Sequence, residues 1–150
     1  KSVALPFNSL SHLVILCCPQ LEAVVVPGNH LQELRIQCCP QLEAILAPYN
    51  RLSYVDLHNF PMLTELDVSN NEFTSLNTTK NTALEKLACV YKQLDLQNNH
   101  ELRWLSCTAN DNIEVLLPDP SAIVKYNING SLIDKTKQRP IKFDEEYEAE

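Results

Sequence analysis

Six cysteines are the residues of this 150-residue chain with the clearest potential for chemistry. Four of them lie in two identical copies of the segment CCPQLEA, residues 17–23 and 38–44. Paired thiols can bind zinc or form a disulfide. Zinc sites usually show a CxxC or CxxxH spacing, and this chain has neither. We therefore expect no metal site and mostly buried, reduced thiols, Cys39 among them. Cys17 and Cys38 are the two expected to be more exposed, and a Cys17–Cys38 disulfide is left open as the alternative.

The remaining reactive residue types do not form a catalytic motif. The four histidines, His12, His30, His58 and His100, share no register and are expected at the surface. The chain has no nucleophile elbow, HExxH segment, phosphate-binding loop or dinucleotide fingerprint. A carboxylate pair such as Glu65 and Asp67 is interpreted as solvated surface. We expect no enzymatic activity and no cofactor.

Charge and hydropathy exclude two further classes of protein. The chain has a formal net charge of −7, whereas a general nucleic-acid binder needs a basic surface. No run of apolar residues is long enough to cross a membrane. Because the chain opens with Lys1 rather than methionine, it is interpreted as a processed product or an excised piece from which a targeting segment could be missing.

An internal repeat in the sequence indicates which secondary-structure elements position these side chains. Segments of the form LxxLxL begin at steps that alternate between 11 and 10 residues, so the unit has 21 residues and two similar halves; the starts are Leu10, Leu21, Leu31, Leu42, Leu52, Leu63, Phe73 and Leu84. The next start, Tyr91, comes after only seven residues. We interpret CVYKQ (89–93) as a shortened turn, after which the pattern continues.

Each half of the unit ends in a recurring small or polar residue at the bend after a strand. A buried asparagine amide can pair there with backbone groups that no longer have a strand partner. One half supplies Asn8, Asn29, Asn50, Asn71 and Asn110, with Ser131 as a weaker match, and the other supplies Cys18, Cys39, Phe60, Asn81 and Asn99, with Ser121 weakest.

The pattern predicts a β-rich solenoid. In a strand, LxL directs two leucines inward and the residue between them outward. One coil cannot bury its own apolar row, whereas coils stacked about 4.8 Å apart can. We expect about six turns of 21 residues with parallel strands and few or no regular helices. Prolines should occupy equivalent turns, where a missing N–H costs little: Pro19, Pro40 and Pro61 in one, and Pro27 and Pro48 in another.

The segments LTELDVSNNEF (63–73) and LQELRIQCCPQL (31–42) resemble the leucine-rich repeat family, in its LxxLxLxxN and LxxLxLxxC variants. The nested period is similar to the short bacterial subclass in which both halves carry the motif. The resemblance covers nearly all of residues 1–133, the expected solenoid, which starts in mid-repeat. Residues 134–150 leave the pattern as a tail that is basic and then acidic. The resemblance implies a right-handed coil and protein–protein recognition.

The outward strand face is the candidate binding surface. Its columns combine carboxylates with a few cations and apolar groups, and the tentative partner-binding set is Glu22, Glu43, Leu46, Glu65, Asp67, Glu85, Lys86, Arg103 and Trp104. Tryptophan is enriched in interface hot spots, although Trp104 could instead pack on the shortened turn near Tyr91. The other half displays a rival face, with Gln32, Arg35, Tyr54, Asp56, His58, Gln93 and Asp95.

The resemblance implies a module of a bacterial surface adhesin or secreted effector that binds a protein partner. The charge and hydropathy of the chain predict no nucleic-acid partner and no membrane span. Two alternatives stay open at this point. The chain could be the substrate-recognition arm of an effector enzyme whose catalytic domain lies outside it, or a structural scaffold that self-associates through open solenoid ends. A secreted or cell-surface location is favoured, and reduced cysteines leave the cytoplasm open.

Overall fold

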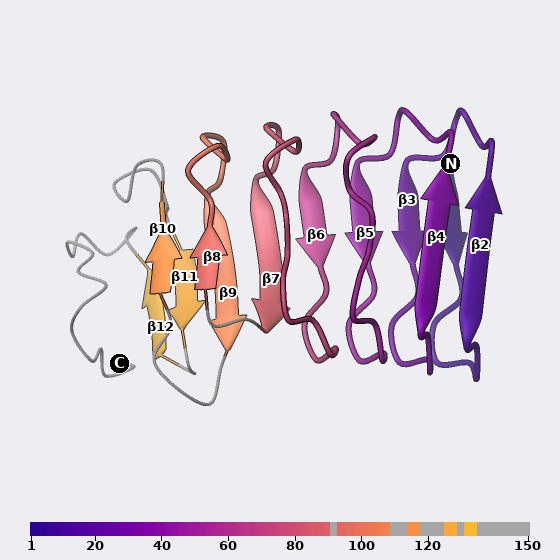
Figure 1. Ribbon diagram of the computed structural model, residues 1–150, viewed down its shortest axis with the longest axis horizontal. Coiled ribbons are helices and arrows are strands. Elements are labelled where there is room, and N and C mark those ends of the chain that lie inside the picture. The colour runs from indigo at the N-terminus through magenta and orange to yellow at the C-terminus, as the bar shows by residue number, and fades with distance from the viewer. Residues whose placement is uncertain (91–92, 109–113, 118–124, 129–130, 135–150) are drawn as a thin grey trace.

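The computed structural model describes residues 1–90, 93–108, 114–117, 125–128 and 131–134, and Asn110, Pro118, Ser121 and the tail from 135 onward lie outside these ranges. In this part of the chain, strands and turns stack as a β-solenoid without a helix, as the repeat predicts (Figure 1). No helix here is long and apolar enough to cross a membrane.

An eight-stranded sheet forms one side of the solenoid, in the order β1-β3-β5-β6-β7-β9-β11-β12. Every neighbouring pair from β1 to β11 is parallel. The strands are β1 (Ser2–Ala4), β3 (Ala23–Val25), β5 (Ala44–Leu46), β6 (Glu65–Asp67), β7 (Lys86–Val90), β9 (Trp104–Thr108), β11 (Lys125–Ile128) and β12 (Ser131–Asp134).

The register of this sheet shows the repeat directly. Ala23 pairs with Ala44, Ala44 with Glu65, and Glu65 with Lys86, so successive partners lie 21 residues apart. Lys86 pairs with Trp104, a step of only 18. The missing residues fall where the shortened turn was predicted, because only residues 91–92 separate β7 from β8 (Gln93–Asp95).

About five turns run from β1 to β9, and β11 continues the parallel sheet beyond them. The expected count of about six is therefore close. The final strand differs from the prediction, because β12 pairs with β11 in the antiparallel direction. Ser131, expected at a turn, is the first residue of β12 and the antiparallel partner of Ile128. A strand that reverses direction does not extend the parallel coil, so β12 departs from the predicted pattern.

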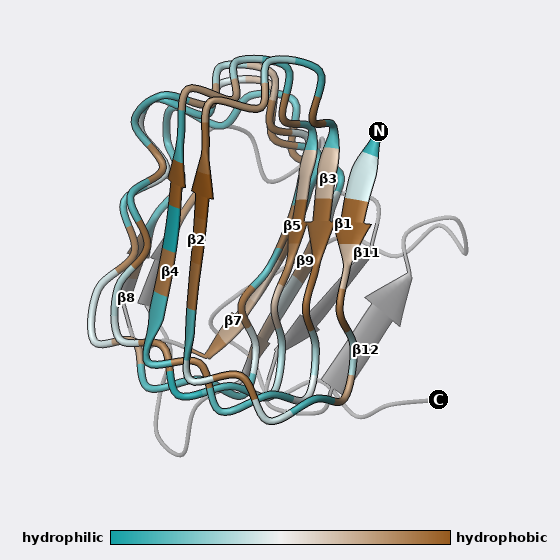
Figure 2. Ribbon diagram, turned by 90° about the vertical axis from the view of Figure 1, so that its right-hand side faces the viewer, coloured by the Kyte–Doolittle hydropathy of each residue, from teal (hydrophilic) through white to brown (hydrophobic). Residues whose placement is uncertain are grey.

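The opposite side of the solenoid carries two separate two-stranded parallel sheets. The first pairs β2 (His12–Leu16) with β4 (Glu33–Gln37), and the second pairs β8 with β10 (Glu114–Leu116). Between them, residues 52–58 and 73–79 contain no strand, although the leucine spacing predicts one in each. Figure 2 shows this side facing the main sheet, with apolar residues along both.

Inward-pointing side chains fill the space between the two sides. Five of the leucines that start the half-repeats have no exposed surface, as the pattern predicts: Leu31, Leu42, Leu52, Leu63 and Leu84. Leu21 is 5% exposed, and Leu10, at the first start, is only partly buried. Full burial of a leucine contributes about 1.5–3 kcal/mol relative to exposure. The repeated apolar row is therefore the main source of stability.

The predicted asparagine column forms a ladder between coils. Asn50 Nδ2 donates to Val26 O at 2.9 Å and to Ala47 O at 3.2 Å, while Asn50 Oδ1 accepts from Leu31 N at 3.1 Å. Asn29 and Asn71 repeat this arrangement one coil before and one coil after. These amides satisfy backbone groups at the bend, which a buried turn would otherwise leave unpaired.

The residue before each ladder asparagine adopts the left-handed conformation. Phe7, Gly28, Tyr49 and Asn70 occupy equivalent positions with φ between 51° and 63°. Only one of the four is glycine, the residue that adopts this conformation without steric cost. The sharp bend is therefore imposed by the coil and its hydrogen bonds rather than by local preference.

Candidate functional site

The structure assembles the predicted outward columns on the eight-stranded sheet. The column Ala23, Ala44, Glu65, Lys86 and Trp104 follows the strand register from β3 to β9. The column Val25, Leu46, Asp67, Ala88 and Ser106 runs beside it in the same register. The half of the repeat that was favoured as the ligand-facing side thus carries the continuous sheet.

Backbone hydrogen bonds hold a third column just before these strands. The carbonyl of Glu22 accepts the N–H groups of Glu43 and Ala44 from the next coil, at 2.8 and 3.0 Å. The carbonyls of Glu43 and Glu85 accept two N–H groups of the following coil in the same way. The acidic side chains of this column therefore start from a rigid backbone, which fixes their spacing.

Charge on the face is mostly negative. Glu22, Glu43 and Glu85 are exposed, and Glu65 and Asp67 are half-buried. Asp67 is the best-positioned carboxylate, because its Oδ1 accepts from Ser69 N at 3.0 Å and Ser69 Oγ at 2.6 Å. Carboxylates on neighbouring coils repel one another at close range. Binding of a cation between them relieves this repulsion and is therefore favourable.

The side-chain cations on this face are only loosely paired, whereas the chain's terminal amino group forms a closer ion pair. Lys86 Nζ lies 3.9 Å from Glu65 Oε2, and Arg103 Nη2 lies 3.6 Å from Glu101 Oε2, with between 41% and 61% of each of the four side chains exposed. The terminal amino group of Lys1 lies 2.9 Å from Glu22 Oε2. Exposed pairs of this kind contribute about 0–1 kcal/mol, so they leave the carboxylates available to another charged group.

Apolar groups interrupt the charged columns. Leu46 and Trp104 are both half-buried on the face, so each keeps part of its apolar surface in contact with water. Trp104 pairs in register with Lys86. The alternative packing partner, Tyr91, lies outside the described residues, and that alternative stays a prediction.

The cysteines follow the predicted division between buried and exposed. No disulfide links any of the six; Cys39, Cys89 and Cys107 are buried, Cys18 is half-buried, and Cys17 and Cys38 are exposed. Cys39 Sγ donates to Gln37 O at 3.3 Å, and Cys18 Sγ donates to Leu16 O at 3.5 Å. These two cysteines lie at the bend where later coils have Asn81 and Asn99, whose side chains also donate to backbone carbonyls. A hydrogen bond with Cys107, together with burial, raises the pKa of Cys89 well above its usual range.

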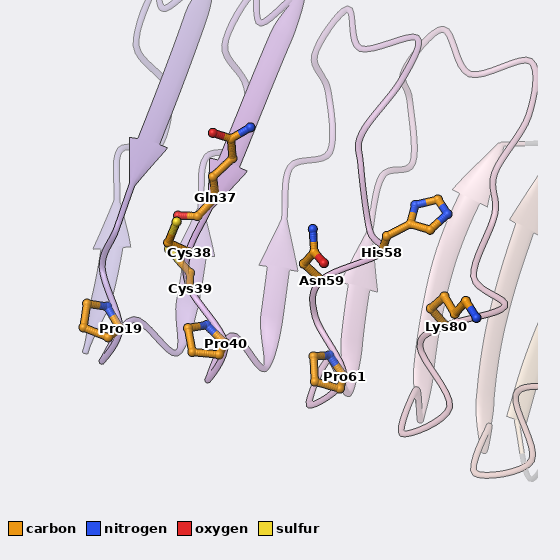
Figure 3. Close-up of a pocket in the computed structure, with 9 residues that line it drawn as sticks. All are labelled: Pro19, Gln37, Cys38, Cys39, Pro40, His58, Asn59, Pro61 and Lys80. Carbon is orange, nitrogen blue, oxygen red and sulfur yellow. The ribbon is translucent and has the colours of Figure 1, made fainter.

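A groove at the lower turns was not predicted from the sequence. Figure 3 shows its rim, where Pro19, Pro40 and Pro61 stand in a row on successive coils. Each proline follows a residue whose carbonyl accepts from the leucine three positions on, as Cys39 O accepts from Leu42 N at 3.2 Å. This is the turn position that favours proline. The equivalent placement of the prolines was itself predicted, and could have indicated the groove.

Two reactive side chains line this groove without forming a catalytic pair. His58 Nδ1 lies 2.9 Å from Asp56 Oδ1, and the hydrogen bonds from His58 lower the pKa of Asp56. The side chains of Cys38 and His58 extend away from each other in Figure 3, with Asn59 between them. All four histidines are exposed, as expected. In the described residues, no cluster of three or more histidine, cysteine or acidic side chains could hold a metal ion.

The rival face on the other side of the coil is more apolar. Val14 and Leu16 of β2 and Tyr54 of the strand-free segment are exposed, by 44%, 51% and 65%. Their neighbours on β4, Glu33, Arg35 and Gln37, are exposed and polar. This side therefore presents a mixed surface over discontinuous sheets, without the carboxylate columns of the main sheet.

A solved structure shares this fold. The functional domain of InlJ from Listeria monocytogenes, a leucine-rich repeat internalin whose structure includes a cysteine ladder, superposes with a TM-score of 0.67 at 23% sequence identity. The match covers 79% of this chain and 28% of the InlJ chain. No protein-family model and no curated protein sequence matches the chain. The likeness establishes a leucine-rich-repeat-type β-solenoid fold.

Proposed function

We propose that this chain is a protein-recognition module of a bacterial leucine-rich repeat protein and that it binds its partner through the outward face of the eight-stranded sheet. One observation carries the proposal. Five carboxylates, Glu22, Glu43, Glu65, Asp67 and Glu85, project from consecutive coils of one rigid sheet, and they outnumber the cations of those coils, which are Lys86, Arg103 and the terminal amino group of Lys1. The fold that this chain shares with the InlJ domain is compatible with a binding role.

The chemistry of the face defines the partner that fits it. Its carboxylates favour a basic surface, and the exposed parts of Leu46 and Trp104 favour apolar side chains between the charges. An interface gains specificity and association rate from complementary charge and gains affinity from buried aromatic groups. The partner we propose is thus a protein with a basic, amphipathic surface.

A selection with displayed peptides tests the proposal while the partner is unidentified. A random peptide library is panned against the immobilised chain, and the selected peptides should be cationic with interspersed apolar residues. Binding of synthetic copies is then measured by fluorescence anisotropy against two variants. The double substitution Glu43→Lys/Glu85→Lys reverses two exposed charges on the face.

The matched control reverses the same number of exposed carboxylates on the opposite side, as Glu33→Lys/Asp95→Lys. Charge reversal on the face should weaken binding by at least about fivefold, and the control should change it by less than about twofold. Peptides that show no charge preference, or that lose as much affinity with the control as with the face variant, would show that this sheet is not the recognition surface.

A further inference from the structure

Cys17 and Cys38 occupy equivalent positions on adjacent coils, both exposed to solvent. Each directly follows a strand, and the pairing of these two strands, β2 and β4, extends as far as Leu16 and Gln37. Cys17 N then donates to Gln37 O at 2.9 Å, which extends the pairing to the cysteine itself. Paired strands lie about 4.8 Å apart, within the Cα separations of about 4.4–6.8 Å that a disulfide spans.

The two side chains leave the backbone in the same conformation. Cys17 has φ of 54° and Cys38 has φ of 57°, so the two Cα–Cβ bonds point in nearly the same direction from neighbouring strands. Their thiols are in hydrogen-bond contact, and this contact is the main cause that raises the pKa of Cys17.

The other cysteines of the chain are arranged differently. Cys18 and Cys39 direct their thiols at carbonyls of their own coils, Leu16 O and Gln37 O. Cys89 and Cys107 are register partners, but both are buried, with 3% and 0% of their surfaces exposed. Only the Cys17 and Cys38 pair combines inter-coil contact with access for a reagent in solution.

We propose that Cys17 and Cys38 form a thiol modification site that closes to a disulfide by exchange with a low-molecular-weight disulfide. The thiolate of Cys38 attacks one sulfur of the reagent, which breaks the reagent's S–S bond and releases one thiolate. Cys17 then loses its proton and attacks the Cys38 sulfur, which releases the second thiolate. Two protein thiols are oxidised and one small disulfide is reduced to two thiols, so atoms and electrons balance.

Closure has two consequences for the molecule. It joins the first two coils covalently through a loop of about twenty residues, which should raise the midpoint of thermal unfolding by about 6–12 °C. It also removes the Cys38 thiol from the rim of the proline-lined groove. Because exchange requires a thiolate, the rate of closure should increase as the pH rises.

The test uses oxidised glutathione as the reagent, with the full chain at pH 8.5. Remaining thiols are alkylated, and tryptic peptides are identified by mass spectrometry. Trypsin cuts after Arg35, between the two cysteine pairs, so closure links peptide 2–35 to peptide 36–51. The linked pair should appear in the wild-type chain without attached glutathione, and the unfolding midpoint should rise.

Serine substitutions assign the linked sulfurs. Cys17→Ser or Cys38→Ser, both at exposed positions, should abolish the link, while the matched control Cys18→Ser on the neighbouring residue should keep it. A link that survives in Cys17→Ser, glutathione that stays attached to Cys17 or Cys38 without closure, links only between molecules, or thiols that do not react would each overturn the proposal.

Discussion

Replacement of Asn50 by alanine should destabilise the chain strongly, although it removes only one small polar side chain. Asn50 is 8% exposed, and its side chain connects two neighbouring coils. Its Oδ1 is the hydrogen-bond acceptor of Leu31 N, a backbone group in a residue with no exposed surface. Val26 O accepts two side-chain hydrogen bonds, and the one from Asn50 Nδ2, at 2.9 Å, is shorter than the one from Asn29 Nδ2, at 3.3 Å.

The magnitude follows from these contacts. Leu31 N–H loses its hydrogen bond inside the protein, which costs about 1–3 kcal/mol for a buried group. The weakened bond at Val26 O adds about 1 kcal/mol. Ala47 O loses a bond at 3.2 Å but keeps the one from Asn71 Nδ2 at 2.9 Å, so its contribution is small. We expect Asn50→Ala to lower the free energy of unfolding by about 2–4 kcal/mol.

Urea unfolding followed by far-ultraviolet circular dichroism measures this loss, provided that the slope with denaturant stays constant. Asn8→Ala is the matched control: Asn8 belongs to the same predicted column, but the structure leaves it exposed and outside the ladder, with its Nδ2 donating to Pro6 O of its own coil. The control should lose less than about 0.5 kcal/mol. A loss below about 1 kcal/mol for Asn50→Ala, or equal losses for the two variants, would refute the account of the ladder.

Three further substitutions test other parts of the structure by the same unfolding assay. Phe60 is only 1% exposed, so Phe60→Ala leaves a cavity and should lower the free energy of unfolding by about 3–5 kcal/mol. A loss near 1 kcal/mol would mean that the coil collapses around the cavity. Trp104→Ala should lower the free energy of unfolding by less than about 3 kcal/mol yet weaken the binding of the selected peptides. A larger loss of stability would show that Trp104 is a core residue. Gly28→Ala should cost about 1–2 kcal/mol because its φ is +63°. Its new Cβ would also meet the exposed ring of Phe7, so adding Phe7→Ala should recover part of that loss, and no recovery would show that the ring moves aside freely.

The leucine spacing predicted the positions that repeat every coil. The outward columns, the asparagine ladder and the equivalent prolines all follow from a fixed period and from alternation along a strand. The exposed Cys17 and the buried Cys39 were predicted for the same reason, since neighbouring residues at one bend face different environments. Periodicity specifies which residues share a column, and the column decides burial.

Hydrogen bonding on the far side could not be predicted in this way. The segment LSYVDLH (52–58) has the same leucine spacing as LQELRIQ (31–37), yet only the second is a strand. Strand pairing depends on the distance between backbones, and side-chain period does not set that distance. The reversal at β12 has the same origin, because leucine spacing says nothing about strand direction. Whether the main sheet binds a partner also stays a prediction, because complementarity depends on a second molecule.

The 18-residue coil between Lys86 and Trp104 has a consequence for how such a chain can change its length. Removal of residues within a connecting turn leaves every later row of the sheet in line with the earlier ones, and insertion of a whole 21-residue unit would do the same. The exact copy of CCPQLEA one unit later is compatible with growth by duplication of this kind. Each added unit would lengthen the face by one row and leave the existing rows intact, so the reach of the surface and its local chemistry can evolve independently.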